Sequence, residues 1–127
     1  MRYLVDTNLL SKQDNPKVRT WLLQHYLQLA ISSVTVAEIA QGIEELPTGT
    51  KRTRLQAFLK EMIEDYPIIP FDTREALEWG RFVASAGRPV PIMDSIIAAT
   101  ALANNLEVAT ENAKDFPGVA VVNPLGR

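Results

Sequence analysis

Apolar positions along this chain follow two patterns that alternate. Short apolar runs, which are typical of buried strands, occupy residues 2–5, 29–32, 68–69, 106–109 and 119–122. Most segments between them carry apolar residues every three or four positions, as amphipathic helices do. Strands that alternate with helices predict an α/β fold, with a central, mainly parallel sheet covered by helices.

Residues that favour helix ends bound the expected helices. Asn15 and Pro16 suit the N-cap and the first position of one helix. Thr35, followed three residues later by Glu38, has the spacing of a capping box, so we expect the next helix to open at Thr35. Further helices are expected at residues 50–66, 73–86 and 92–104. The last of these is apolar on all sides, which indicates a buried helix.

The composition narrows the classes of protein and of site. A chain of 127 residues, 46% hydrophobic and 22% charged, fits one globular domain over residues 1–127. The lack of cysteine excludes disulfides and thiolate sites, and the single histidine, His25, excludes a metal site of several histidines. We expect His25 to be a surface or packing residue. No apolar run is long enough to cross a membrane and no signal-peptide pattern begins the chain, so a cytoplasmic protein is expected.

Acidic residues stand where a parallel sheet would gather them, just after strands or at helix starts. These are Asp6, Glu38, Asp94 and Asp115. Each has an ordinary alternative, since Asp6 and Asp94 could cap helices, Glu38 could complete the capping box and Asp115 could lie in a solvated turn. Ligands of open α/β sheets bind beyond the carboxyl ends of the strands. Carboxylates gathered there repel one another unless a cation is present, and ligands that are all oxygen suit Mg²⁺ or Mn²⁺.

The net charge of −2 argues against a nucleic-acid partner, because such partners usually meet a basic surface. That argument weakens if the acids are concentrated in one pocket. Basic residues do crowd the start of the helix expected at 50–66, against its dipole: Lys51, Arg52 and Arg54. They could contact phosphate, or pair with Glu44 and Glu45 just before the helix. Trp21 and Trp79 lie in apolar helical patterns and are expected to pack in the core or at a dimer interface.

Four segments together resemble the PIN domain, and in particular the VapC-like toxins of type II toxin–antitoxin pairs, including the FitB-like subgroup. They are "LVDTNLL", "SSVTVAEIAQGI", "PIMDSIIAATALANNLEVATENAKDF" and "VAVVNP", and they occur in the family's order over essentially the whole chain. The resemblance implies an α/β/α sandwich and a Mg²⁺- or Mn²⁺-dependent ribonuclease that is silenced by a cognate antitoxin. It also implies a homodimer.

By motif position, Asp6, Glu38 and Asp94 correspond to the family's three principal acids. The family's fourth acid stands either where this chain has Asn112 or where it has Asp115, so Asp115 is favoured and Asn112 is expected to support it. The resemblance implies that Asp6 and Asp94 hold the metal directly and that Asp115 holds it directly or through water. Glu38 is counted with these metal residues and is expected to orient or deprotonate the attacking water.

Two further residues are expected to support the site, and one departs from the family pattern. Asn8 and Thr110 are expected to fix carboxylates or phosphate by hydrogen bonds. Glu111 stands where the family often has a basic residue, and this departure could alter a substrate contact or the local charge.

Two other functions remain open at this point. A PIN-like module could bind RNA or a partner without turnover, although all the acids are retained. A Mg²⁺-dependent phosphoryl-transfer protein, such as a response-regulator-like receiver or a small phosphatase, would also end its first strand in acids. A receiver needs a lysine late in the sheet, and this chain has none there.

Overall fold

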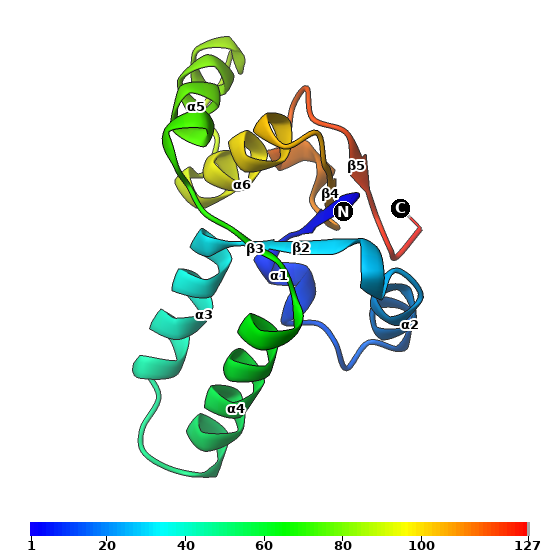
Figure 1. Cartoon of the computed structure of the whole chain (residues 1–127), viewed down its shortest axis with the longest axis vertical. Helices are drawn as coiled ribbons and strands as arrows, with labels where there is room; N and C mark the ends of the chain where they lie inside the picture. Colours follow the sequence, from blue (N-terminus) through cyan, green and yellow to red (C-terminus); the bar gives the residue numbers. More distant parts are fainter. Residues whose placement is uncertain (127) are drawn as a thin grey trace.

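A five-stranded parallel sheet forms the centre of the molecule (Figure 1). The computed structural model describes residues 1–126. The strands are β1 (Tyr3–Val5), β2 (Leu29–Ser32), β3 (Ile68–Ile69), β4 (Glu107–Ala109) and β5 (Val121–Val122). They lie in the order β3-β2-β1-β4-β5, so β1 is the central strand. The α/β fold with a parallel sheet is therefore confirmed.

Within residues 1–126, six α-helices and two 3₁₀ turns connect the strands. The helices are α1 (Thr7–Leu10), α2 (Pro16–Gln24), α3 (Ser33–Glu44), α4 (Thr50–Asp65), α5 (Thr73–Ser85) and α6 (Ile92–Ala103). The turns are η1 (Tyr26–Gln28) and η2 (Ala113–Asp115), which the hydrophobic pattern does not predict. Asn15 caps α2 as expected, because its side chain accepts a hydrogen bond from the Lys17 N–H.

Alternate residues of each strand point into two separate cores. In β1, Tyr3 and Val5 join the core that contains residues of α1, α2 and α4, and residues of α3 pack against it. Leu4 points the other way, into the core formed with α5 and α6. The sheet thus lies between two helical layers, which is the α/β/α sandwich that the resemblance implies.

The start of α3 differs from the prediction. The helix begins at Ser33, and the Ser32 side chain accepts a hydrogen bond from the Val34 N–H at 3.1 Å. Thr35 lies inside the first turn and is fully buried, so the predicted Thr35–Glu38 capping box is wrong. The physical reason is that β2 runs directly into α3, and the last residue of the strand serves as the cap.

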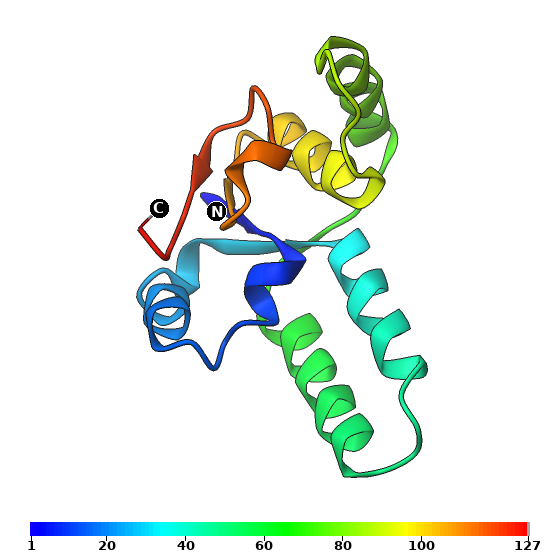
Figure 2. The same ribbon diagram turned by 180° about the vertical axis from the view of Figure 1, so that it is seen from behind.

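The helices differ in how closely they approach the sheet. Figures 1 and 2 show α3 and α4 side by side as a hairpin that projects away from the sheet, while α5 packs on α6 at the other side. Within residues 1–126, no helix is both long and apolar enough to cross a membrane.

Candidate active site

Asp6 lies at the carboxyl end of the central strand and is only 2% exposed. The Thr110 hydroxyl, at the end of β4, donates a hydrogen bond of 2.8 Å to Asp6 Oδ2. Asp6 occupies the N-cap position of α1, but its side chain makes no capping hydrogen bond, so the capping alternative is not realised. Burial raises the pKa of Asp6 and the Glu38 charge adds to the rise, while Thr110 and the backbone amides of α1 oppose it.

Glu38 is tied to the same edge of the sheet by a threonine. Thr7 Oγ1 donates a hydrogen bond of 2.7 Å to Glu38 Oε1 and lies 2.9 Å from Thr35 Oγ1. Thr7 directly follows Asp6, so these contacts join the first turn of α1 to the first turns of α3. Glu38 therefore faces the acidic edge of the sheet rather than the solvent-exposed side of its helix.

Asp94 lies in the first turn of α6, three residues after the N-cap residue Pro91. Burial is the largest cause that raises its pKa from 3.8 to about 6, and the charges of Asp6, Asp115 and Glu38 contribute to the same rise. These four carboxylates are thus near enough to act on one another. Figure 2 shows the first turns of α1, α3 and α6 gathered at one side of the sheet.

The loop after β4 brings in Asp115 at the end of η2. The loop folds back on itself, because the Asn112 N–H donates to Thr110 Oγ1 at 3.0 Å and the Asp115 N–H donates to the Asn112 carbonyl at 2.9 Å. Arg88, in the loop before α6, donates to the Lys114 carbonyl. Asn112 therefore shapes the loop through its backbone, while Asp115 contributes the charge that acts on Asp94.

The donor set has the chemistry of a site for a hard cation. The acidic side chains offer only oxygen atoms, and their mutual repulsion would be offset by a bound divalent ion. Within residues 1–126, however, no three acidic or histidine side chains already converge as a set of metal ligands. The residues fit the cation in kind and charge, and their carboxylates would have to converge further to bind it.

Asn8 and the basic residues at the start of α4 were also predicted to belong to the site or to bind RNA. Asn8 is exposed, and within the described residues its side chain forms no hydrogen bond. Arg52 pairs with Glu44 at 2.9 Å, as the alternative reading of the basic helix start expects. Lys51 and Arg54 instead line a groove of about 730 Å³ between α3, α4 and the turn after α1. The structure thus splits this basic group.

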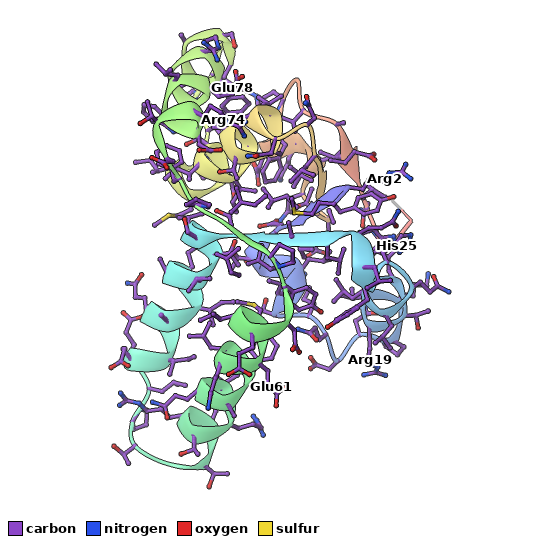
Figure 3. The ribbon with its side chains drawn as sticks, in the orientation of Figure 1. Arg2, Arg19, His25, Glu61, Arg74 and Glu78 are labelled. Carbon is purple, nitrogen blue, oxygen red and sulfur yellow. The ribbon has the colours of Figure 1, made fainter. Side chains whose placement is uncertain are left out.

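His25 packs at the opposite end of β1 from Asp6, as expected of a packing residue. Its ring stacks on Trp21, with centroids 4.3 Å apart, and meets the Tyr3 ring edge-on. Figure 3 shows His25 beside α2. Trp79 is likewise structural, because its indole N–H donates to Ser95 Oγ between α5 and α6.

Sequence reasoning missed Thr7 and Thr35. The sequence holds one signal for Thr7, a hydroxyl directly after a carboxylate at the end of a strand. It holds none for Thr35, whose direction depends on how α1 packs against α3.

The fold and the site together define a class of protein: an α/β/α sandwich with an acidic site at the carboxyl edge of its parallel sheet. The chain belongs to the PIN domain family, whose profile matches residues 3–122. Two curated relatives match over nearly their whole length. Toxin FitB of Neisseria gonorrhoeae is 34% identical over 95% of this chain and 96% of its own, and Ribonuclease VapC1 of Rickettsia felis is 28% identical over 91% and 89%.

A solved structure shows the same fold. The toxin–antitoxin complex from Klebsiella pneumoniae contains a chain that superposes with a TM-score of 0.77 and is 27% identical, covering 96% of this chain and 97% of that one. These similarities place the chain among the VapC-like and FitB-like PIN proteins.

Proposed function

We propose that this protein is a Mg²⁺- or Mn²⁺-dependent endoribonuclease and the toxin of a type II toxin–antitoxin pair. The observation that carries the proposal is the meeting of four acids from separate elements at one edge of the sheet, near enough for three of them to act on Asp94. Such a group of like charges is costly without a cation and useful with one. The relatives named ribonuclease and toxin support the same activity.

The residues take separate roles in this proposal. Asp6, Asp94 and Asp115 would hold the metal, which supplies Lewis acidity and lowers the pKa of water when bound. Glu38, held by the Thr7 hydroxyl, would orient the attacking water or accept its proton. Thr110 fixes Asp6 in place. No covalent intermediate with the protein is needed.

The partners follow from the same proposal. A cognate antitoxin would silence the enzyme, as the relative solved as a toxin–antitoxin complex suggests. RNA is the substrate, and Lys51 and Arg54 are candidates for contacts with its phosphates. We also propose a homodimer, on the resemblance alone.

A cleavage assay tests the activity. Wild type, Asp94→Asn and Glu61→Gln would be purified identically and freed of any partner. Each would then be incubated with transfer RNA and with single-stranded RNA in Mg²⁺, in Mn²⁺ and in EDTA. Glu61 is the matched control, because it is an exposed acid on the projecting α4 (Figure 3).

We expect wild type and Glu61→Gln to cleave RNA only with metal. Asp94→Asn should lose roughly a hundredfold or more of the rate, the order seen when one charge-stabilising group is removed from an active site. Cleavage that persists in EDTA, or an Asp94→Asn variant as active as wild type, would overturn the proposal. RNA binding without any cleavage would instead indicate a PIN-like binding module.

A further inference from the structure

A lysine pairs with a glutamate of the loop that borders the acidic site. Lys12, in the turn after α1, forms an ion pair with Glu111. Glu111 directly follows Thr110, whose hydroxyl donates to Asp6. The other residues of this turn line the groove between α3 and α4: Ser11, Gln13 and Asp14. Lys12 is thus the member of the turn that reaches the loop beside Asp6.

The two partners of this ion pair differ in solvent exposure. The Lys12 side chain is 47% exposed, whereas that of Glu111 is 12% exposed. Ion pairs open to water contribute little to stability, because solvent screens them and ordering a long side chain costs entropy. The Lys12 ammonium is thus open to water and can exchange Glu111 for another anion that approaches from solvent.

The charge of the nearby acidic site suggests which anion could replace Glu111 as the partner of Lys12. Asp6, Glu38, Asp94 and Asp115 make the site strongly negative, and RNA presents a phosphate at every nucleotide. One or two metal ions can offset charge at the scissile phosphate, but the neighbouring phosphates still approach an acidic surface. A cation at the rim would attract one of them. In the free protein that cation is occupied by a carboxylate.

We propose that Glu111 is an internal phosphate mimic. Its carboxylate holds Lys12 in the free protein, and a backbone phosphate of bound RNA takes its place. Lys12 is then an RNA-binding residue, and Glu111 sets how tightly RNA is held. This inference rests on the proposed function, because it names a contact for the same substrate at the same site.

RNA affinity measured in an Asp94→Asn parent, where the RNA is not consumed, tests the exchange. Fluorescein-labelled single-stranded RNA of mixed sequence and labelled transfer RNA would be titrated at several salt concentrations and followed by anisotropy. The variants are Lys12→Met, Glu111→Gln and the two combined. Melting temperatures would confirm that each variant is folded.

We expect Lys12→Met to weaken binding about twofold to fivefold, as loss of one exposed charge contact does. Its slope of log affinity against log salt should fall by about 0.7, which corresponds to one phosphate of a single strand. Glu111→Gln should tighten binding by a similar factor. Lys12→Met should also cost more affinity when Glu111→Gln is present, because the lysine then has no internal competitor.

Other outcomes separate this inference from the proposed function. If both single variants weaken binding alike, the ion pair is only a structural tie between loops, and the inference fails. If Lys12→Met leaves the salt slope unchanged, Lys12 does not contact RNA. If the parent binds neither RNA and wild type cleaves neither, the proposed function fails, and this inference with it.

Discussion

Asp94 keeps its proton to a higher pH than an ordinary aspartate, and this costs the folded protein stability. Burial, together with the charges of Asp6, Asp115 and Glu38, raises its pKa from 3.8 to about 6. At neutral pH the group must ionise against these forces, whereas in the unfolded chain it ionises freely. The metal-free site is therefore a source of instability that the rest of the fold has to offset.

A pH series on the metal-free protein should reveal this cost. A folded-state pKa above the unfolded value means that the folded protein binds more protons, so stability rises as pH falls through about 6. We expect the melting temperature in EDTA to increase as the pH is lowered from neutral to about 5. Asp94→Asn should melt higher than wild type at neutral pH and lose part of this pH dependence. An Asp94→Asn variant less stable than wild type at neutral pH would contradict the reasoning.

Thr7 offers a second test at the scale of one hydroxyl. Its hydrogen bond of 2.7 Å fixes Glu38, so Thr7→Val should leave that carboxylate free to rotate. We expect turnover of RNA to fall roughly tenfold to a hundredfold, the usual effect of removing a group that orients a functional side chain. Thr7→Ser keeps the hydroxyl and should retain most activity. Equal rates for Thr7→Val and wild type would exclude this role.

The acids could be predicted from sequence and the hydroxyls could not. Asp6 follows a strand, and the rule that parallel strands end at one edge places it without further knowledge. Thr35 lies in a helix whose rotation about its axis is fixed only by packing against α1. The spacing of residues along the chain does not predict roles that depend on such packing.

At the scale of elements, the junction between α5 and α6 depends on a buried glutamate. Glu75 is 4% exposed and completes the capping box of α5 with Asp72. Its other oxygen accepts a hydrogen bond from Asn104 Nδ2, at the end of α6, at 3.0 Å. Burial alone would raise the pKa of Glu75, but the hydrogen bonds and the nearby Arg74 outweigh burial and lower it.

Glu75→Ala should therefore destabilise the protein by about 1–3 kcal/mol, because it leaves buried donors without an acceptor. Since the folded-state pKa is lowered, the contribution of Glu75 is complete above the ordinary value of 4.5 and is lost as pH falls through the folded value. Urea unfolding at neutral and acidic pH should show the difference from wild type shrinking in acid. Glu78→Ala, on the same helix, is the control and should cost less than about 1 kcal/mol.

Element types were easier to predict than element ends. Short continuous apolar runs separate the strands from the longer helices, in which apolar residues recur every three or four positions. The start of α3 was misplaced because Ser32 belongs to the strand and also caps the helix. The local sequence shows Ser32 as part of the strand but does not show that it also caps the helix.

At the scale of the whole molecule, the four acids of the proposed site come from distant parts of the chain. Asp6 follows β1, Glu38 lies in α3, Asp94 lies in the first turn of α6 and Asp115 ends η2. A bound ion would tie these parts together only in the folded state. The order of the strands, which creates this meeting point, is not visible in any local pattern.

Metal should therefore stabilise the whole fold. A ligand at a hundredfold excess over its Kd adds about 2.7 kcal/mol, which corresponds to a rise of roughly 10 °C in melting temperature for a chain of this size. We expect Mn²⁺ or Mg²⁺ to give this rise in wild type and in Glu61→Gln. Asp94→Asn and Asp115→Asn should show little of it. An equal rise in all four proteins would mean that the ion binds elsewhere.

The central place of β1 also bears on how the protein is made. Translation produces β1 first and its neighbour β4 about a hundred residues later, since Tyr3 pairs with Glu107. Until β4 has been synthesised, one side of β1 has no partner strand. Thr110 and Asp115 are also not yet present to join Asp6. A nascent chain therefore carries no complete acidic site. The proposed toxin would therefore become active only after nearly all of residues 1–122 have been synthesised.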